Sequence, residues 1–558
     1  MKKRVLSVIM AVGILAGFGS AAAADGGFSD VPGGDWAGEY ISKASELGIM
    51  NGYGDGRFGY GDSVTRAQFA AMLTRLFGWE PAISDSPSFS DNSREKWHHG
   101  EVEAAVKNGA VLADTELFRP DDNITRGEMA VMLVRALGYD ALAGQLESAP
   151  MPFTDIGGNR AYIAMAYDFR IINGISDTMF GPDQCATREQ AAAMMIRLYD
   201  SYTRVYTFRH AFYAISSYSQ KDAIAALDAV TFGWSRMEYH DGPVLNTKRS
   251  PENDYGIPDG YEEVIALAKS GGTKAHLGVY MSALRGLTLS DGTATNPCAE
   301  ILTNSENRTS AVAQIVAELT RGDNFTGVTI DFEEMRGGAL RSGLNAFLGE
   351  LRAELDTLGM TLYVCVHPVT ADGAYYDAYD YRAIGELADR VILMAHDYAA
   401  TSLTESEMAS GFVWTPVTPI ASVYSALRAA VSESSGVADS SKLLLAFSMN
   451  YIQWERSEGA VVNKNAYRPQ PDAIYSRMTS DVAALGYSEI YENPYITYTD
   501  DNGHDHILWY EDARSISAKA GLARMFGVTG FSVWRLGIIP NYGAALHFNV
   551  LDTILELS

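Results

Sequence analysis

Residues 325–335 read FTGVTIDFEEM, and this stretch decides how the second half of the chain is interpreted. Side chains alternate along a β-strand, so Thr329, Asp331 and Glu333 point one way and the apolar residues between them point the other way. If the apolar set packs against helices, Asp331 and Glu333 face the inside of a sheet. Two carboxyl groups that close cannot ionise independently, so the pKa of one must rise. Glu334 falls on the opposite face and is the weaker candidate; a pair of solvated acids at a sheet rim is the alternative.

Seven more short apolar runs surround this stretch after residue 205, with helical patterns between most of them. The eight predicted strands are Phe212–Tyr218, Ala229–Trp234, His276–Ser282, Gly327–Glu334, Thr361–Val366, Val391–Tyr398, Leu443–Met449 and Gly530–Arg535. This alternation predicts an α/β fold, a (β/α)8 TIM barrel, in which chemistry sits at the C-terminal ends of the strands. Residues 451–511, rich in Tyr and Asp, predict a small insertion before the last strand, over the barrel mouth. An open doubly wound sheet is disfavoured, because no glycine-rich phosphate loop follows the first strand.

The N-terminal part repeats itself three times. The repeats open with FSD, FSD and FTD at Phe28, Phe89 and Phe153, and the second helix of each begins at Thr65, Thr125 and Thr187. In each repeat Gln or Glu follows that threonine three residues later, which is a capping box. The chain is therefore predicted to be multidomain, with an all-α triplet before the barrel. The predicted boundaries are 1–24 for a signal peptide, 25–80, 86–140 and 150–200 for the repeats, and 207–558 for the barrel.

An arginine follows the capping threonine in every repeat, at Arg66, Arg126 and Arg188. A cation in the first helical turn opposes the helix dipole by ~0.3–1 kcal/mol. Three such arginines in register in an acidic chain indicate an anion site, because arginine beside free N–H groups binds anions. The alternative is a structural ion pair inside each repeat.

Composition excludes several classes of protein. The formal net charge of −26 disfavours binding to nucleic acid or to anionic membranes. A basic start, an apolar run from Val5 to Phe18 and small residues up to Ala24 predict a cleaved signal peptide, and the run is too short for a transmembrane anchor. The cysteines and histidines show no CxxC motif and no metal-ligand spacing, and Ser216-Ser217 lacks a nucleophile elbow. No metal, cofactor, disulfide scaffold or serine hydrolase is expected.

The three repeats resemble S-layer homology domains in their FSD openings, in Trp36 and Trp97, in the GY-x-DG-x-F turn and in the TRAE-like box. The resemblance implies a pseudo-threefold helical module that binds an anionic, typically pyruvylated, secondary cell-wall polysaccharide. Arg66, Arg126 and Arg188 would contact the acid group, and Trp36 and Trp97 would line the sugar grooves. The third repeat departs from the family pattern, with Tyr162 near the tryptophan position and GISD at residues 174–177 in place of the turn.

The barrel resembles glycoside hydrolase family 18, whose fourth-strand signature is close to DG-x-D-x-D-x-E. Here the last acid pair is kept, and Thr326 and Thr329 replace the two earlier aspartates. The sixth strand ends in LMAHD (393–397), similar to the family's M-x-Y-D, and the eighth contains GFSVWRLG (530–537). That ending, with YTDDNG (498–503) and WYEDA (509–513), resembles the subgroup that acts on spore and cell-wall peptidoglycan.

The resemblance implies retaining, substrate-assisted hydrolysis of N-acetylated glycans. Glu333 would be the general acid, and Asp331 would orient the acetamido group of the substrate. Asp397 would support the acetamido oxygen, although a helix N-cap or a supporting acid is an equal reading of this residue. His396 stands where the family has a tyrosine, so modest activity or an unusual glycan is expected. The implied substrate-binding residues are Trp534 as the apolar floor, Tyr398 and Thr329, the last two by alternation.

The sequence is consistent with two functions. The first is a secreted, cell-wall-anchored glycosidase on the S-layer surface of a bacterium, acting on β-1,4-linked N-acetylglucosamine glycans, with peptidoglycan before chitin. The second is a catalytically weak or inactive surface protein that binds glycans. The Thr326, Thr329 and His396 departures favour the second function, and retention of Asp331 and Glu333 favours the first. The expected partners are an N-acetylated glycan and the anionic wall polysaccharide, with no nucleic acid and no transmembrane anchor.

Overall fold

The computed structural model describes residues 27–146, 150–250, 253–370, 375–412, 416–539 and 541–557. The predicted signal peptide lies outside the described residues. None of the helices in these ranges is both long and apolar enough to span a bilayer.

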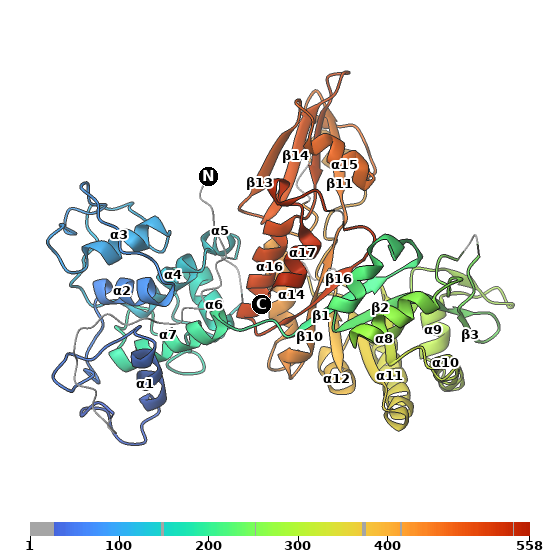
Figure 1. The fold of residues 1–558 in the computed structure, drawn as a ribbon, viewed down its shortest axis with the longest axis horizontal. Helices are drawn as coiled ribbons and strands as arrows, with labels where there is room; N and C mark the ends of the chain where they lie inside the picture. The colour runs from blue at the N-terminus through green and yellow to red at the C-terminus, as the bar shows by residue number, and fades with distance from the viewer. Residues whose placement is uncertain are drawn as a thin grey trace.

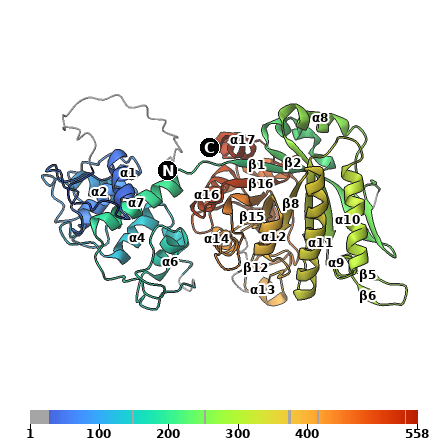
Figure 2. The ribbon, with the colours of Figure 1, turned by 90° about the horizontal axis from the view of Figure 1, so that it is seen from below.

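Eight parallel strands close into a barrel after residue 205 (Figures 1 and 2). They are β1 (Phe208–Tyr213), β2 (Ala229–Tyr239), β4 (Lys274–Ser282), β7 (Gly327–Glu333), β8 (Thr361–Val366), β9 (Arg390–Leu393), β10 (Leu443–Ser448) and β16 (Gly530–Trp534). Each strand pairs in parallel with the next one along the chain, and β16 pairs with β1 to close the ring. The predicted TIM barrel is therefore confirmed.

Only β8 has the predicted bounds; most other strands differ by one to five residues at an end, and the differences at β1 and β9 have physical reasons. β1 begins at Phe208 rather than Phe212, because the polar residue His210 lies inside the barrel and its ring is hydrogen-bonded there. β9 ends at Leu393 rather than Tyr398, so the strand alternation does not continue through residues 394–398.

Helices cover the outside of the barrel, as Figure 2 shows for α10, α11 and α12. The helices of this half are α8 (Glu262–Gly271), α9 (Pro297–Leu302), α10 (Ser305–Leu319), α11 (Gly338–Leu358), α12 (Tyr381–Leu387), α13 (Glu405–Ala409), α14 (Ile420–Ala430), α16 (Ala513–Met525) and α17 (Val550–Glu556). Short strands extend the loops, namely β3 (Pro243–Asn246), β5 (Leu287–Thr288) and β6 (Ala294–Thr295). The apolar face predicted for the helix after the fourth strand is buried on α11, including Leu344, Phe347 and Leu351.

The predicted insertion is a separate antiparallel sheet that projects from the barrel (Figure 1). Its strands are β11 (Ile452–Ser457), β12 (Ala460–Val461), β13 (Ala484–Ser488), β14 (Asn493–Thr499) and β15 (Asp505–Trp509), and it carries α15 (Pro471–Met478). The order across the sheet is β12-β11-β15-β14-β13. Because the sheet follows β10 directly, it rises from the C-terminal ends of the barrel strands.

A chain of hydrogen bonds crosses the barrel interior below the acid pair. His210 bridges Ser532 and Thr231, at 2.8 Å to each hydroxyl. The Thr231 hydroxyl lies 2.6 Å from the Thr329 hydroxyl, and His276 Nδ1 lies 3.2 Å from Thr329. Burial lowers the pKa of His210 to about 3, so this ring is neutral and accepts as well as donates hydrogen bonds. The chain fills the barrel interior with satisfied polar groups beneath Asp331.

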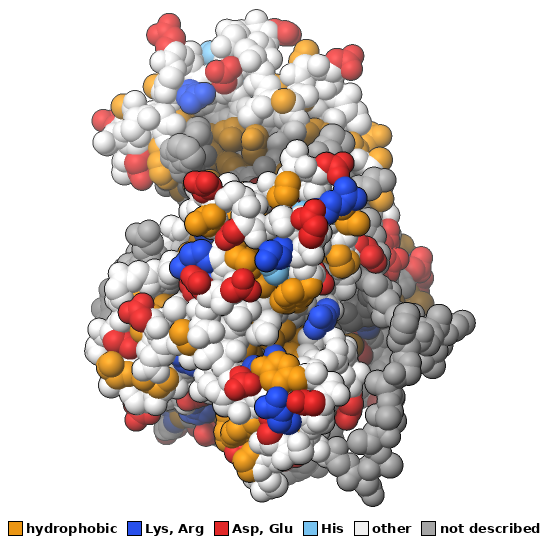
Figure 3. Space-filling view, turned by 90° about the vertical axis from the view of Figure 1, so that its left-hand side faces the viewer, with side chains coloured by type: hydrophobic (Ala, Val, Ile, Leu, Met, Phe, Trp, Pro, Cys, Tyr) orange, Lys and Arg blue, Asp and Glu red, His pale blue; other side chains and the backbone are white. Residues whose placement is uncertain are grey.

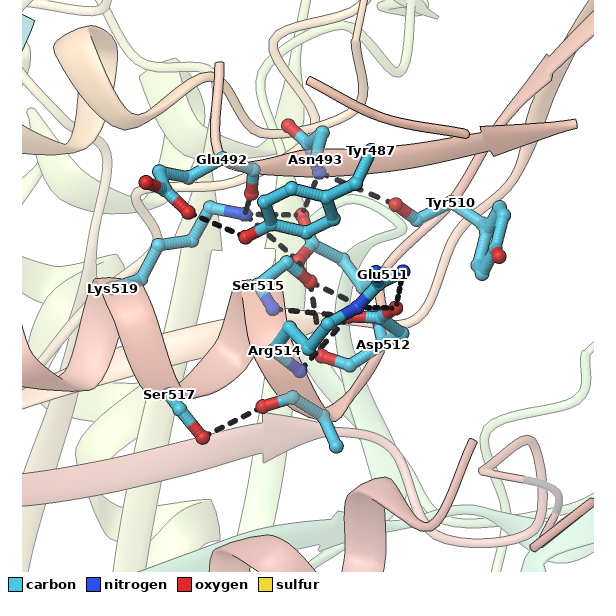
Figure 4. A network of polar contacts seen from close by, with 11 residues as sticks. Tyr487, Glu492, Asn493, Tyr510, Glu511, Asp512, Arg514, Ser515, Ser517 and Lys519 are labelled. Atoms are coloured by element: carbon cyan, nitrogen blue, oxygen red, sulfur yellow. Dashed lines mark hydrogen bonds and ion pairs between the residues drawn. The ribbon is translucent and has the colours of Figure 1, made fainter. Parts of the chain in front are cut away.

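A buried network ties the insertion to the barrel (Figure 4). Lys519 of α16 donates to both carboxylate oxygens of Glu511 at 2.8 Å. Glu511 also accepts hydrogen bonds from Asn493 at the start of β14 and from Ser515. Asp512 caps α16 through the backbone N–H groups of residues 514 and 515. The WYEDA stretch thus joins β15, β14 and α16.

The three repeats share one local design. Their helices are α1 (Gly38–Glu46), α2 (Arg66–Leu76), α3 (His99–Lys107), α4 (Arg126–Ala136), α5 (Asp140–Ala143), α6 (Arg160–Asp168) and α7 (Arg188–Tyr202). The predicted capping boxes are complete at α2 and α4. At α7 only the Thr187 backbone N–H donates to Gln190, and within the described ranges the Thr187 hydroxyl has no hydrogen-bond partner. The aspartate of each opening motif accepts backbone N–H groups from the turn before the second helix; Asp30, for example, binds residues 58, 59 and 60 at 2.7–2.9 Å. The opening motif therefore shapes the turn that precedes each capping box.

The repeats form a closed ring through the three arginines. Arg66 Nε donates to the Phe118 carbonyl of repeat 2, Arg126 Nε to Phe180 of repeat 3, and Arg188 Nε to Phe58 of repeat 1. Isolated β-bridges link the same junctions: Ser63 with Thr187, Thr65 with Asn123, and Thr125 with Cys185. The module is thus helical but includes β-bridges, and the arginines bridge successive repeats rather than lie within one.

Repeat 3 docks directly on the barrel, with α6 and α7 beside α14 and α16 (Figures 1 and 2). Asp168 at the end of α6 is buried and accepts a hydrogen bond from Arg428 Nε of α14 at 2.7 Å. It also accepts a hydrogen bond from the Tyr424 hydroxyl. The Phe169 ring lies 5.3 Å from that of Phe526, and the apolar core is continuous across the junction. The opposite face of the repeats, in Figure 3, mixes acidic, basic and apolar side chains.

Candidate active site

The acid pair lies at the C-terminal end of β7. The Thr329 hydroxyl is hydrogen-bonded inside the barrel to Thr231 and His276, so Asp331 and Glu333, which follow Thr329 at two-residue steps along β7, lie on the interior face. Asp331 is 7% exposed and Glu333 is half-buried. Burial, followed by the negative charges of Asp331, Glu334 and Asp397, raises the pKa of Glu333. Glu333 therefore holds its proton at higher pH than an ordinary glutamate, as a general acid must.

Asp331 has a different environment from Glu333. Burial raises its pKa, and the negative charge of Glu334 adds to this effect. The thiol of Cys365 on β8 and the nearby His396 act in the opposite direction. Because these two groups favour the ionised form of Asp331, the pair separates into a stronger acid at Asp331 and a weaker acid at Glu333.

His396, Asp397 and Asn450 form a polar group after β9. His396 Nδ1 lies 2.9 Å from one carboxylate oxygen of Asp397, and Asn450 Nδ2 donates to the other at 2.8 Å. Burial raises the pKa of Asp397, but His396, Asn450 and Ser448 outweigh it and hold that pKa below its usual range. Asp397 is not a helix N-cap, because the next helix, α13, begins at Glu405 with Thr404 as its cap. The group stands within electrostatic range of both members of the acid pair.

Glu334 lies beside the acid pair, where the regular strand ends. Its backbone has φ +64°, which ends the strand alternation, and its side chain accepts a hydrogen bond from Ser282. Its backbone N–H donates to His367 Nε2 at 3.2 Å. Glu334 therefore adds negative charge beside the acid pair, which helps to raise the pKa of both Asp331 and Glu333.

The three predicted substrate-binding residues lie in three different places. Trp534 ends β16, half-buried, with its ring 5.1 Å from Phe212 inside the barrel. Thr329 is fully buried below Asp331, and its hydroxyl is occupied by Thr231 and His276. The expected inward direction of Tyr398 does not hold, because β9 ends at Leu393. Its hydroxyl lies 3.5 Å from the Ser422 carbonyl of α14, and its ring packs against the core beneath the helices.

Sequence reasoning missed two tyrosines at this end of the barrel. The rings of Tyr255 and Tyr280 stack with centroids 4.8 Å apart. Burial, and the charges of Asp331 and Glu333 among others, raise the pKa of both hydroxyls. Tyr280 could have been found by alternation from His276 along β4. Tyr255 lies in a loop, where no periodic pattern points to it.

A groove of about 610 Å³ lies at the junction of repeats 1 and 2. Its lining includes Arg66, Arg119, Glu128 and Arg135, and the apolar side chains of residues 117 and 118. Arg66 Nη1 is held by Glu128 at 2.6 Å, and Arg119 also binds Glu128 at 2.8 Å. A groove of this volume with clustered guanidinium groups is suited to an anionic sugar.

The other predicted wall-binding residues lie outside this groove. Trp36 and Trp97 are 54% and 58% exposed, just before α1 and α3. Arg126 and Arg188 are each 5% exposed and donate to backbone carbonyls of the neighbouring repeat. Within the described ranges neither of these two forms an ion pair with a carboxylate. Glu128 of repeat 2 is replaced by Gln190 and Gln68 at the two corresponding junctions.

Comparison with known proteins agrees with both halves of the molecule. The profile of "Glycosyl hydrolases family 18" matches residues 288–538, and that of the "S-layer homology domain" matches 27–70, 88–130 and 152–192. The cortical fragment-lytic enzyme of Bacillus subtilis (strain 168) is 28% identical over 242 residues, covering 43% of this chain and 52% of that protein. An endoglucanase of Bacillus sp. (strain KSM-635) is 36% identical over 176 residues, covering 31% of this chain and 18% of that protein.

The chain thus spans about half of the first relative and less than a fifth of the second. Among solved structures, the "C-terminal domain of putative chitinase from Desulfitobacterium hafniense DCB-2" aligns with a TM-score of 0.50 and 21% identity, over 63% of this chain and all of that one. This alignment supports the barrel fold. The chain therefore carries three S-layer homology domains followed by a glycoside hydrolase family 18 domain.

Proposed function

We propose that this protein is a surface-anchored glycosidase that hydrolyses β-1,4-linked N-acetylglucosamine glycans, with peptidoglycan as the substrate. The observation that carries the proposal is the acid pair at the end of β7, in which burial and neighbouring charge raise the pKa of the Glu333 carboxyl. A protonated carboxylic acid beside an ionisable aspartate, in a family 18 barrel, suits acid-catalysed cleavage of a glycosidic bond.

The proposed mechanism is substrate-assisted. Glu333 donates its proton to the glycosidic oxygen while the carbonyl oxygen of the substrate's acetamido group attacks the anomeric carbon. The bond to the leaving sugar breaks, and a cyclic oxazolinium forms. The Glu333 carboxylate then removes a proton from water, whose oxygen attacks the anomeric carbon and restores the original configuration. Asp331 orients the acetamido group and stabilises the positive charge on its nitrogen.

The remaining residues of the site support that reaction. The proposed role of Trp534 is to provide an apolar surface for a pyranose ring. The proposed role of His396 is to donate a hydrogen bond to the acetamido oxygen, while Asp397 and Asn450 fix the orientation of its ring. Peptidoglycan is preferred to chitin because a relative of the catalytic half is a cortical fragment-lytic enzyme.

The repeats are proposed to hold the enzyme on a bacterial cell surface, associated with the S-layer. Their ligand would be an anionic secondary cell-wall polysaccharide, bound in the groove that contains Arg66 and Arg119. The buried guanidinium groups of Arg126 and Arg188 would attract the polymer electrostatically at the other two junctions.

The decisive experiment measures reducing N-acetyl sugars released from purified peptidoglycan and from chitin oligomers. We expect release from peptidoglycan, and a loss of about 10²–10⁴-fold with Glu333→Gln, because that variant has no proton to donate. Glu354→Gln is the matched control; it should keep its activity, because Glu354 is exposed on the outer helix α11. Equal release by wild type and Glu333→Gln would refute the mechanism. No release, with glycan binding retained, would indicate a surface-binding protein instead.

A further inference from the structure

A cluster of metal-ligand side chains lies on the insertion sheet, apart from the acid pair. Glu455 on β11 is aligned with His506 on β15, and His504 precedes His506 by two residues, on the same face of the ribbon. Asp500 belongs to the turn between β14 and β15. One ligand atom each from Glu455, Asp500 and His504 lies within 4.8 Å of the other two.

The local contacts fix the three ligands in place. His504 Nδ1 lies in hydrogen-bond contact with Glu455 Oε1. One oxygen of Asp500 accepts the backbone N–H groups of Asn502 and His504, at 2.9 Å each, which orients the carboxylate within its turn. A metal-binding carboxylate needs such support, because an unfixed ligand loses conformational entropy on binding.

The buried His506 ring contacts the Asp500 carboxylate. The ring is 8% exposed, and its Nδ1 lies 3.0 Å from Gln453 Nε2, which is a donor. With Gln453 Nε2 as the donor to Nδ1, the tautomer that carries its proton on Nε2 directs an N–H group at the second oxygen of Asp500, 3.5 Å away. In protein metal sites a ligating carboxylate is typically hydrogen-bonded by a neighbouring side chain that does not itself bind the metal. His506 stands in that relation to Asp500.

Charge also favours a cation at this place. Glu455 and Asp500 bring two carboxylates together, and within the described ranges neither forms an ion pair with lysine or arginine. Each is about one-third exposed on its side chain, at 31% and 28%, as is His504 at 33%. Water can therefore enter and complete the coordination of an ion.

We propose that Glu455, Asp500 and His504 bind one divalent transition-metal ion of the zinc type. Two carboxylate oxygens and one imidazole nitrogen, with a position left for water, form a ligand set that suits zinc. Calcium and magnesium prefer ligand sets made of oxygen alone. The ion would join β11 to the β14–β15 turn, at the end of the ribbon away from the barrel, and would stabilise the insertion rather than take part in hydrolysis.

The test is calorimetric titration of the metal-free, dialysed protein with ZnCl2, repeated with MgCl2. We expect one zinc ion per chain and no comparable binding of magnesium. Asp500→Asn and His504→Ala should each weaken zinc binding at least ~10-fold, which is the lower end of the effect of losing even an outer-shell partner. In Asp500→Asn the side-chain oxygen still accepts the turn N–H groups, so this variant separates loss of a ligand from loss of the fold.

His240→Ala is the matched control, because His240 also faces a glutamate, Glu238, at 3.0 Å but belongs to no three-ligand cluster among the residues that the structure describes. Its zinc affinity should equal that of the wild type. Cobalt(II) absorption provides a second readout of the imidazole ligand, and it should disappear in His504→Ala. The proposal is overturned if wild type binds no zinc, or if Asp500→Asn and His504→Ala bind it as tightly as wild type and the His240→Ala control.

Discussion

The buried Lys519–Glu511 pair gives a sharp test of how the insertion is held to the barrel. The two side chains are 1% and 2% exposed, and the ammonium group contacts both carboxylate oxygens at 2.8 Å. Lys519→Met removes the cation and leaves a buried carboxylate with only Asn493 and Ser515 as side-chain donors. Breaking a buried pair on one side costs about 3–5 kcal/mol of unfolding free energy. We expect the melting temperature of the barrel to fall by ~6–10 °C, at about 2 °C per kcal/mol for a large domain.

A second variant separates loss of the pair from loss of packing. In Lys519→Met/Glu511→Leu no charge remains, and replacing a buried ion pair by apolar side chains is often neutral or stabilising. Asn493 and Ser515, which lose Glu511 as an acceptor in the double variant, keep other acceptors: Asn493 also donates to the Tyr510 carbonyl, and Ser515 to the Asp512 carbonyl. Differential scanning calorimetry of the full chain should therefore show the double variant to be more stable than Lys519→Met alone.

The exposed pair Lys269–Asp323, at 3.1 Å, is the control, and Lys269→Met should change the melting temperature little. A cost below ~1 kcal/mol for Lys519→Met, or a double variant whose losses simply add, would refute the argument that an uncompensated buried charge is what destabilises the single variant.

Three further outcomes are expected. The kcat/KM profile should fall on its acid side as Asp331, which acts ionised, is protonated, and on its alkaline side only as pH rises through the elevated pKa of Glu333, which acts protonated. An alkaline limb that begins between pH 4 and 5, where an ordinary glutamate titrates, would contradict this assignment. Glu128→Gln removes the carboxylate that holds Arg66, so the affinity for anionic wall polysaccharide should rise by up to about fivefold. That factor corresponds to ~1 kcal/mol, the value of a partly exposed ion pair. An unchanged affinity in a pull-down titration would place the polymer elsewhere. His396→Tyr restores the family's residue, and it should alter both the turnover rate and the preference between peptidoglycan and chitin oligomers. An unchanged rate on both substrates would show that residue 396 does not contact the acetamido group.

Strand alternation predicted the acid pair because both residues lie inside one strand. Asp331 and Glu333 occupy regular positions on β7, so a local rule was sufficient. The same rule failed for Tyr398, because it depends on where a strand ends, and β9 ends at Leu393. Strand ends depend on which neighbours are available for pairing, and that information is distributed along the whole chain.

Long-range hydrogen bonds explain the other differences. His210 lies in β1 inside the barrel, where its Nδ1 is hydrogen-bonded to the hydroxyl of Ser532, 322 residues away. Arg188 is oriented by the Phe58 carbonyl, 130 residues away, so repeat periodicity could reveal the arginine but not its partner. The sequence showed that the three arginines are equivalent, and only the structure showed that Glu128 makes one junction different from the other two.

The junction between repeat 3 and the barrel connects anchoring to catalysis. Asp168 is a buried carboxylate, and burial raises its pKa while Arg428 and Tyr424 oppose that effect. Separating the two halves would expose Phe169 and Phe526 and would break this hydrogen-bonded group, so a separated state has a higher free energy. Phe169 and Asp168 belong to the repeats, and Arg428 and Tyr424 to the helix between β9 and β10. Repeat 3 therefore sets the orientation of the barrel relative to the repeats through packed and hydrogen-bonded contacts rather than through a flexible linker.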